Sequence, residues 1–417
     1  MGEYLLKCVG CGSIQPPHEL ICINDDALLR TEYMAKRLTP KDLPGIWKFY
    51  DWLPVMKPLT GVGERPVTYR SQGLARELGL RNLYISFSGY WPERDAFMPT
   101  CSFKELEASP TIERTIERPD DSVLVVSSVG NTARAFAHAA SAAGQPLILV
   151  VPERNLPRLW ITEIPSDKIC LVAVKGNYND AIDFGAHLAM QPGFVGEGGA
   201  RNVARRDGMG VVMLDAALTM KTLPMHYFQA VGSGTGGISA WEAALRLIQD
   251  GRFGKTMPRL HLAQNLPCAP IFSSWTGARL ESECPGGMYD DVLYNLRPPY
   301  EVDGGLREAL LSTDGNVYGI TLQEAQEAHR LFEESEEIDI LEAAAVAVAA
   351  LKQAVLSGAV SSDELILLNI TGGGVQRLRE EAYLQMLSCQ MKFDPSDITA
   401  DEDLFKDIRE FLGRSDE

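Results

Sequence analysis

The sequence predicts an α/β fold built on parallel sheets. Apolar segments rich in Val and Ile alternate with segments of helical periodicity through most of the chain, a pattern typical of parallel strands joined by helices. The sequence contains no internal repeat and no low-complexity segment. A length of 417 residues with 45% apolar content is enough for two domains with large cores.

The expected elements follow one another along the chain. Short Val, Ile and Leu runs bounded by polar or glycine residues predict strands over residues 121–129, 145–152, 167–176, 210–217, 226–231, 258–264 and 363–371. Helical periodicity predicts helices over residues 131–144, 179–191 and 239–251, the first ended by its glycine. The apolar run 343–351 is far shorter than the roughly 20 residues that cross a bilayer, so we expect a buried helix there.

Charge and cysteine content narrow the class of protein. The formal net charge is −17, and no Lys/Arg cluster interrupts it, which favours a small-molecule enzyme over a nucleic-acid binder. The first residues lack a basic segment followed by an apolar one, so we expect a cytoplasmic protein without a membrane partner. The eight cysteines are spread too thinly for a disulfide framework.

Three of these cysteines form a group near the N-terminus. Cys8 and Cys11 have C-x-x-C spacing, and Cys22 follows, with Asp25 where a zinc ribbon would have its fourth thiolate. Zinc accepts carboxylates, but structural sites prefer Cys and His. A knuckle without metal is therefore the favoured interpretation, and Cys8, Cys11 and Cys22 are the alternative zinc ligands.

Three loops come directly after expected strands, where ligands bind in open parallel sheets. Residues 127–133 join a strand to a helix whose N-terminal amides suit a carboxylate or phosphate, although a plain Ser/Asn helix cap has the same pattern. Residues 369–374 end a strand in Thr371, whose hydroxyl could meet a heteroaromatic nitrogen.

The third loop, residues 230–239, contains G-x-G-x-x-G. A dinucleotide site would need an acidic residue after the next strand, which instead ends in Gln264 and Asn265. A Walker loop is excluded because no Gly-Lys-Ser/Thr follows at the required spacing. A tight turn that binds one terminal phosphate, or a merely flexible turn, remains.

A lysine upstream, taken with these loops, forms an ordered set of four motifs. Lys104 ends the stretch TCSFK (100–104), which is followed in order by SSVGN (127–131), GSGTGG (232–237) and TGGG (371–374). This order resembles the threonine synthase branch of the fold-type II pyridoxal-phosphate enzymes, over nearly the whole chain. The resemblance implies a fold like that of the tryptophan synthase β subunit, with two α/β domains, parallel-rich sheets and the cofactor in the cleft between them.

The resemblance also implies domain boundaries and cofactor contacts. We expect a Cys-containing segment over residues 1–45, a large cofactor-binding domain over 46–115 and 215–417, and a small substrate-binding domain over 116–214. By the same resemblance, Lys104 binds pyridoxal 5′-phosphate covalently and serves as the catalytic base, Asn131 bonds its phenolic oxygen, and Thr371 faces its pyridine nitrogen. The cofactor phosphate would be bound by Gly232, Ser233, Gly234, Thr235 and Gly236.

The substrate site departs from the threonine synthase pattern. Ser128, Val129, Gly130 and Thr132 stand where the family binds the substrate carboxylate, and Val129 replaces a threonine of the family. Cys101 replaces a glycine of the family's lysine motif. Residues 197–217 bring three arginines close together in the sequence: Arg201, Arg205 and Arg206. Arginines can bind compact anions through charge-assisted hydrogen bonds, although these three could equally pair with surface acids.

With these departures, the sequence most resembles the branch of this family that replaces the phosphate of O-phosphoserine by sulfite. We therefore expect a homo-oligomeric enzyme that acts on O-phosphoserine and sulfite. Threonine synthase, or another replacing enzyme such as a cysteine synthase, is the alternative within the family. A non-catalytic anion or nucleotide binder that uses only the loops is the alternative outside it.

Overall fold

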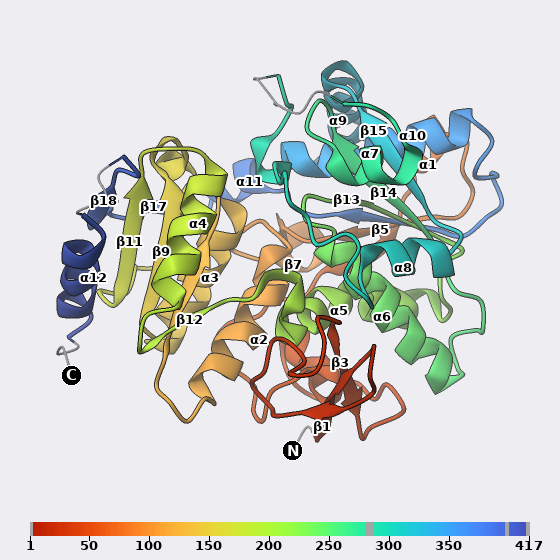
Figure 1. Ribbon diagram of the computed structural model, residues 1–417. Helices are drawn as coiled ribbons and strands as arrows, with labels where there is room; N and C mark the ends of the chain where they lie inside the picture. The colour runs from red at the N-terminus through yellow and green to blue at the C-terminus, as the bar shows by residue number, and fades with distance from the viewer. Residues whose placement is uncertain (1–2, 281–286, 397–399, 414–417) are drawn as a thin grey trace.

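The computed structural model describes residues 3–280, 287–396 and 400–413. Two α/β halves lie side by side, and a small sheet of N-terminal residues packs at the bottom of the view (Figure 1). The α/β class and the alternation of strands and helices expected from the sequence are confirmed in both halves. Within the described residues, no helix is both long enough and apolar enough to span a membrane.

The larger sheet has six strands in the order β15-β14-β13-β16-β5-β4. Neighbouring strands are parallel except β4 and β5, which are antiparallel. The strands are β4 Val67–Arg70, β5 Leu83–Phe87, β13 His226–Ala230, β14 Arg259–Asn265, β15 Asn316–Ile320 and β16 Ile366–Ile370.

Alternate residues of these strands face two different cores. In β16, Leu367 packs on one face, whereas Ile366 and Leu368 pack on the other. The face of Leu367 is covered by α5 Val203–Met220, α6 Thr235–Asp250 and α8 Leu306–Ser312. The opposite face is covered by α1 Gly73–Glu77, α9 Leu322–Glu336 and α10 Glu342–Leu356. Both faces of this sheet are therefore buried, as the near-continuous apolar strands predict.

The smaller sheet is parallel throughout, in the order β12-β8-β9-β11-β18. Its strands are β8 Val123–Ser127, β9 Leu147–Pro152, β11 Ile169–Val174, β12 Phe194–Gly196 and β18 Met391–Phe393. Helix α3 Asn131–Ala143 covers one face, and α4 Tyr178–Ala189 with α12 Ala400–Phe411 covers the other. Helix α2 Lys104–Ile116 packs against both α3 and α5 and so joins the two halves.

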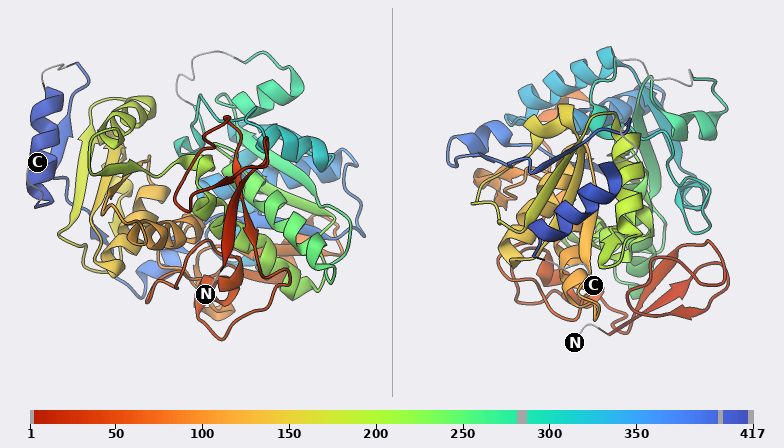
Figure 2. Two further views of the ribbon diagram at one scale, coloured as in Figure 1. Left: turned by 60° about the horizontal axis from the view of Figure 1, so that its bottom comes forward. Right: turned by 60° about the vertical axis from the view of Figure 1, so that its left-hand side comes forward.

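The C-terminal residues differ from the expected domain boundaries. Strand β18 pairs with β11 of the smaller sheet, and α12 lies against the same sheet (Figures 1 and 2). The ring of Phe393 stacks on Phe184 of α4 with 4.2 Å between centroids, and α12 adds Leu404, Phe405 and Ile408 to that core. Strand β18 and helix α12 therefore pack with residues 116–214, because these apolar side chains close the face that α4 leaves open.

The strand expected over residues 210–217 is wrong, since these residues lie inside α5. The helix packs between α2 and α6 and is buried on all sides, so no polar stripe marks its helical period. Gly208 allows the close approach: a Cβ there would lie 2.0 Å from the carbonyl oxygen of Leu106 in α2.

The N-terminal residues form an antiparallel sheet in the order β2-β1-β3, with β1 Tyr4–Cys8, β2 Ile14–Gln15 and β3 Leu29–Tyr33. The hydroxyls of Thr31 and Tyr33 each donate a 2.6 Å hydrogen bond to the carboxylate of Asp207 in α5. These buried bonds attach the small sheet to the helix that leads into the functional site.

Short elements complete the chain. They are η1 Gly45–Trp52, β6 Tyr90–Trp91, η2 Pro92–Arg94, β7 Ala96–Phe97, η3 Glu153–Arg158, β10 Trp160–Ile161, η4 Gly199–Arg201, α7 Pro270–Thr276, η5 Asp291–Leu293, α11 Val375–Arg379 and β17 Gln385–Met386.

Candidate active site

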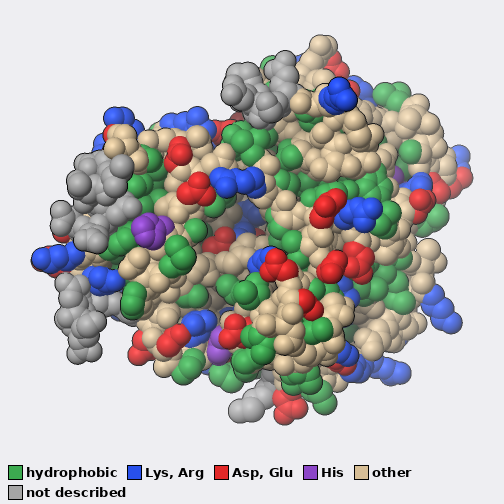
Figure 3. All heavy atoms as spheres, in the orientation of Figure 1, with side chains coloured by type: hydrophobic (Ala, Val, Ile, Leu, Met, Phe, Trp, Pro, Cys, Tyr) green, Lys and Arg blue, Asp and Glu red, His purple; other side chains and the backbone are tan. Residues whose placement is uncertain are grey.

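A cavity of about 450 Å³ lies between the two halves, at the carboxyl ends of β8, β13 and β16. Figure 3 shows the surface hollowed there, with acidic and basic side chains at the floor. Most of the residues predicted from the sequence line this one cavity: Lys104, Ser128, Val129, Asn131, Thr132, Arg201, Arg205, Gly232, Ser233, Gly234, Thr235, Gly236 and Thr371. Gly130 and Arg206 are not among its lining residues.

Backbone pairing sets the position of Lys104. The Phe103 amide donates to the carbonyl of Thr371 (3.0 Å), and the Gly373 amide donates to the carbonyl of Cys101 (3.2 Å). The lysine at the start of α2 is thereby fixed next to the end of β16. Cys101 has φ +51°, a conformation that favours glycine, which is the residue of the family motif at this position.

The amine of Lys104 lies beside a buried carboxylate. Its Nζ is 3.6 Å from Oε1 of Glu107, one helical turn along α2, and about a quarter of the lysine side chain is exposed. Burial lowers the pKa of Lys104, and the negative charge of Glu107 opposes that shift. Because burial makes the amine easier to deprotonate than that of a free lysine, it is better suited to act as a nucleophile or a base.

Two carboxylates compensate the charge of Arg205. Its guanidinium donates a 2.6 Å hydrogen bond to Oε1 of Glu107, the oxygen that also faces Lys104, and a second bond to Glu197. Burial lowers the pKa of Arg205, but the two carboxylates outweigh it and raise the pKa. Arg205 therefore links the lysine's helix to the cavity wall formed by residues 197–201.

Arg206 was expected at the substrate, and the structure places it elsewhere. Its side chain is fully buried between α5 and the N-terminal sheet, where it donates to the carboxylate of Glu242 and the carbonyls of Ala200 and Leu29. Successive residues of a helix differ by about 100° in direction, so Arg205 and Arg206 cannot both face the cavity. Arg206 is a structural residue.

Arg201 reaches the cavity from η4. Its guanidinium bonds the carbonyl of Asp26 (3.0 Å) and lies 3.4 Å from that residue's largely exposed carboxylate. An ion pair to an exposed acid is weak. Arg201 is thus less neutralised than Arg205 and better suited to bind an added anion.

The start of α3 forms the side of the cavity that belongs to the smaller sheet. The hydroxyl of Ser128 accepts hydrogen bonds from the amides of Gly130 and Ala133, both at 3.1 Å, and so gives one amide in the first turn of the helix a partner. Asn131 and Thr132 line the cavity directly. Gly130 does not line the cavity, and a Cβ there would lie 3.3 Å from the side chain of Arg158.

The glycine loop after β13 forms the opposite side of the cavity. Gly234 has φ +85°, and a Cβ there would lie 2.4 Å from Leu306. A Cβ on Gly236 would lie 2.0 Å from the amide of Gln229. The loop can therefore pack closely only with glycines at these positions. It presents the first amides of the 16-residue helix α6, which have no intrahelical partners.

These groups fit the cofactor that the resemblance implies. Pyridoxal phosphate needs a primary amine for its aldehyde and an anion site for its phosphate. The cavity offers the amine of Lys104 and the N-terminus of α6 as its anion site. Thr371 and Asn131 line the same cavity.

Several residues of the site were not predicted from the sequence. Glu107, Glu197, Tyr178 and Gln229 either line the cavity or contact Lys104. Glu107 could have been found, since a helix that begins at Lys104 brings the residue three positions later onto the same face. Glu197 stands four residues before Arg201, and only the tertiary fold shows that it pairs with Arg205.

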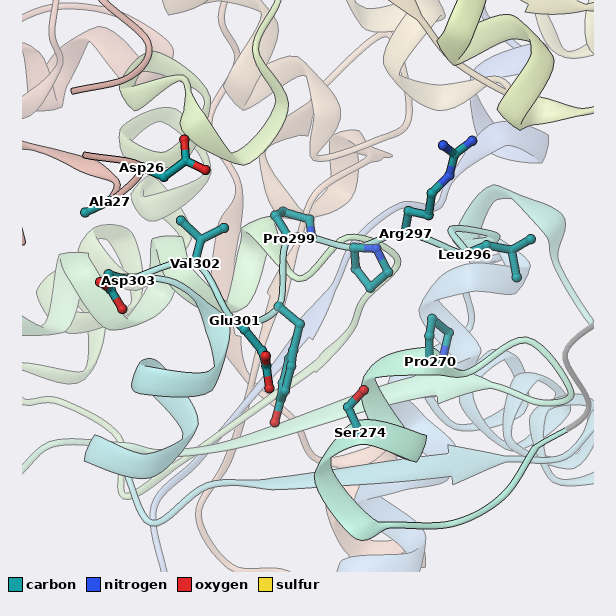
Figure 4. Close-up of a pocket in the computed structure, with 12 residues that line it drawn as sticks. Asp26, Ala27, Pro270, Ser274, Leu296, Arg297, Pro299, Glu301, Val302 and Asp303 are labelled. Carbon is teal, nitrogen blue, oxygen red and sulfur yellow. The ribbon is translucent and has the colours of Figure 1, made fainter. Parts of the chain in front are cut away.

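A second cavity, of about 600 Å³, lies where residues 296–303 pass over the N-terminal segment and α7 (Figure 4). Acidic side chains of Asp26, Glu301 and Asp303 line it, and Arg297 is the basic residue among its lining residues. This charge disfavours an anionic substrate. Pro299 lines both cavities, so the segment of residues 296–303 separates them.

The three N-terminal cysteines also come together. Cys8, Cys11 and Cys22 meet Asp25 outside the active-site cavity, at one end of β1.

Comparisons with known proteins agree with this geometry. The family model described as pyridoxal-phosphate dependent enzyme matches residues 59–372. The chain is similar to the cysteate synthase of Methanococcoides burtonii, with 56% identity over 99% of both chains. It is also similar to the cysteate synthase of Methanothrix thermoacetophila, with 54% identity over 99% of this chain and 100% of that protein. Among solved structures, the processed threonine deaminase isoform 2 of Solanum lycopersicum has a similar fold, with a TM-score of 0.56 at 15% identity, covering 75% of this chain and 87% of that one.

Proposed function

This chain belongs to the family of pyridoxal-phosphate dependent enzymes, and on that premise we propose that it acts as a cysteate synthase. The reaction converts O-phospho-L-serine and sulfite to L-cysteate and phosphate. The observation that carries the proposal is the meeting of Lys104, the N-terminus of α6 and the start of α3 in one cavity. The similarity to the curated cysteate synthases directs the choice among replacement reactions.

The cofactor is pyridoxal phosphate, and the glycine loop and three side chains of this chain would hold it. Gly232 to Gly236 supply amides and hydroxyls to the phosphate, and the loop geometry supports this role. Lys104 would bind the aldehyde carbon, Asn131 would donate to the phenolic oxygen, and Thr371 would be the partner of the ring nitrogen. A hydroxyl at that nitrogen does not require a protonated ring, which suits replacement at the β-carbon.

Lys104 moves the proton. When bound, the cofactor disperses the negative charge that develops at Cα of the amino acid. The amine of Lys104, whose pKa is lowered by burial, takes the Cα proton. The bond between Cβ and the phosphate oxygen then breaks, and phosphate leaves with that bond's electron pair. Sulfite supplies its sulfur lone pair to form the Cβ–S bond, and the proton returns to Cα.

Two groups would orient the anionic substrates. The start of α3 binds the carboxylate through its amides and the side chains of Ser128, Asn131 and Thr132, together with the backbone of Val129. Gly130, which was expected to contact the substrate, does not line the cavity, and its amide donates to the hydroxyl of Ser128 instead. Arg201 binds phosphate and then sulfite, because its pairing with exposed Asp26 leaves its charge available. Arg205 is a positioning residue, since its guanidinium is already paired with the carboxylates of Glu107 and Glu197.

Phosphate release separates this proposal from its alternatives. The purified enzyme is mixed with O-phosphoserine with and without sulfite, and products are identified by chromatography. We expect cysteate and phosphate in equal amounts only when sulfite is present. Threonine formed from phosphohomoserine, with no cysteate, would identify a threonine synthase. Cysteine formed with sulfide, and no reaction with sulfite, would identify a cysteine synthase.

The assembly and location are also proposals. We infer a homo-oligomer, as the resemblance implies. Light scattering at several protein concentrations tests this inference, because it measures the molar mass of the particle in solution. We infer a cytoplasmic location, which is supported by the seven described cysteines being free thiols, as a reducing compartment keeps them. Fractionation of the native cells tests the location.

A further inference from the structure

The N-terminal sheet brings four metal-ligating side chains to one point. Cys8 ends β1, Cys11 lies on the turn between β1 and β2, and Cys22 and Asp25 lie on the segment that leads to β3. One ligand atom of each lies within 4.8 Å of all the others. None of these residues lines the active-site cavity or contacts the catalytic lysine.

The distances match a tetrahedral site. Zinc lies about 2.3 Å from thiolate sulfur and about 2.0 Å from carboxylate oxygen, so tetrahedral ligands lie about 3.8 Å (S to S) and about 3.5 Å (S to O) apart. The Sγ atoms of Cys11 and Cys22 are 3.6 Å apart, and Cys8 Sγ lies 3.1 and 3.4 Å from the two oxygens of Asp25. A disulfide would require about 2.05 Å between sulfurs.

Surrounding donors point at the ligand atoms. Cys22 Sγ accepts from the backbone amide of Asn24 (3.4 Å) and from Nε2 of Gln15 (3.5 Å). The side-chain amide of Asn24 lies 3.8 Å from Cys11 Sγ, and the Ala27 amide donates to Asp25 (3.0 Å). Such donors stabilise thiolate and carboxylate charge around bound metals.

We propose that Cys8, Cys11, Cys22 and Asp25 form a structural zinc site. Zinc binds thiolate sulfur and carboxylate oxygen together, whereas iron–sulfur clusters take cysteines at nearly all positions. Four protein ligands close the coordination shell, so the ion has no open position for catalysis. The sequence favoured a knuckle without metal because one cysteine is replaced by Asp25, but the geometry gives that carboxylate the fourth position.

The proposed zinc site lies next to the residue that contacts Arg201 of the active-site cavity. Asp26, directly after the ligand Asp25, bonds Arg201 through its carbonyl and carboxylate. Val9, between the two cysteines of the turn, packs against Gly304. Zinc would therefore fix the backbone that orients Arg201 at the cavity.

Metal analysis of the full-length, cofactor-loaded enzyme tests the proposal. Untagged protein is dialysed against micromolar zinc chloride, passed over a chelating resin and analysed by mass spectrometry for metals. We expect about one zinc per chain in the wild type and in Cys389→Ser, which alters a half-buried cysteine outside the cluster. Competition with a chromophoric chelator should show affinity at least about tenfold lower in Cys11→Ala and Asp25→Ala.

The variant Asp25→Cys separates a ligand from a merely structural aspartate. It completes a four-cysteine site and should keep one zinc with at least the wild-type affinity. The proposal is overturned if wild type holds no more zinc than Cys11→Ala, or if Asp25→Cys loses zinc while Cys389→Ser keeps it.

Discussion

Replacing Glu107 by Gln should lower the pKa of Lys104 in the cofactor-free protein. At an effective dielectric of about 20, unit charges 3.6 Å apart interact by about 5 kcal/mol. A quarter of the Lys104 side chain is exposed and Arg205 shares the same carboxylate oxygen, so solvent and the second cation reduce this value. We expect a shift of about 1 to 2 pKa units downward, or about 1.4 to 2.8 kcal/mol.

The sign follows from the charge that is removed. The carboxylate favours the protonated amine, so without it the amine becomes neutral at lower pH and is acylated faster there. Competitive acetylation of the cofactor-free protein across a pH series, read by mass spectrometry of the Lys104 peptide, measures the midpoint. Glu105→Gln is the matched control, because Glu105 is also buried on α2 but bonds Thr100 and the Glu64 amide instead. A midpoint that stays in place or rises in Glu107→Gln would refute the role of this carboxylate.

Three further variants test the other parts of the site. Arg201→Gln should raise KM for O-phosphoserine about tenfold with little change in kcat, whereas Arg297→Gln, at the second cavity, should leave both unchanged; equal effects would contradict anion binding by Arg201. Arg206→Met should lower the free energy of unfolding in urea by about 3 kcal/mol, since it leaves Glu242 with Arg30 alone; a change in KM without loss of stability would contradict its structural role. Gly234→Ala should weaken cofactor binding by at least about tenfold in equilibrium dialysis, because φ +85° and Leu306 both disfavour a side chain; unchanged affinity would show that the loop shape is not required.

The sequence predicts those elements whose hydrophobic periodicity or terminating residues can be recognised within the element itself. Strand β16 and Thr371, which directly follows it, are predicted from an apolar run that stops at glycines, and α3 is predicted from its periodicity and Gly144. Residues 210–217 of helix α5 have the pattern of a strand because burial on every side removes the helical stripe. Strand β18 has only three residues and pairs with β11 from more than 200 residues away, so no local pattern marks it.

The site residues also fall into those that the local sequence identifies and those that only the tertiary structure identifies. Lys104, Asn131 and the glycine loop were found because each stands in a recognisable sequence context after or before an element. Arg205 and Arg206 look equivalent in sequence, and only the direction of each side chain on α5 distinguishes the cavity residue from the buried one. Glu107 and Glu197 acquire their meaning from pairs formed across the fold, which composition and spacing do not show.

The central claim is that Lys104 is the residue that binds the cofactor in the cavity between the two halves. Borohydride reduction of the purified enzyme, followed by proteolysis and peptide mass spectrometry, tests it most directly. We predict that the reduced cofactor is found on Lys104 and that Lys104→Ala carries no label and does not turn over O-phosphoserine. Label on another lysine, or full turnover by Lys104→Ala, would contradict the account.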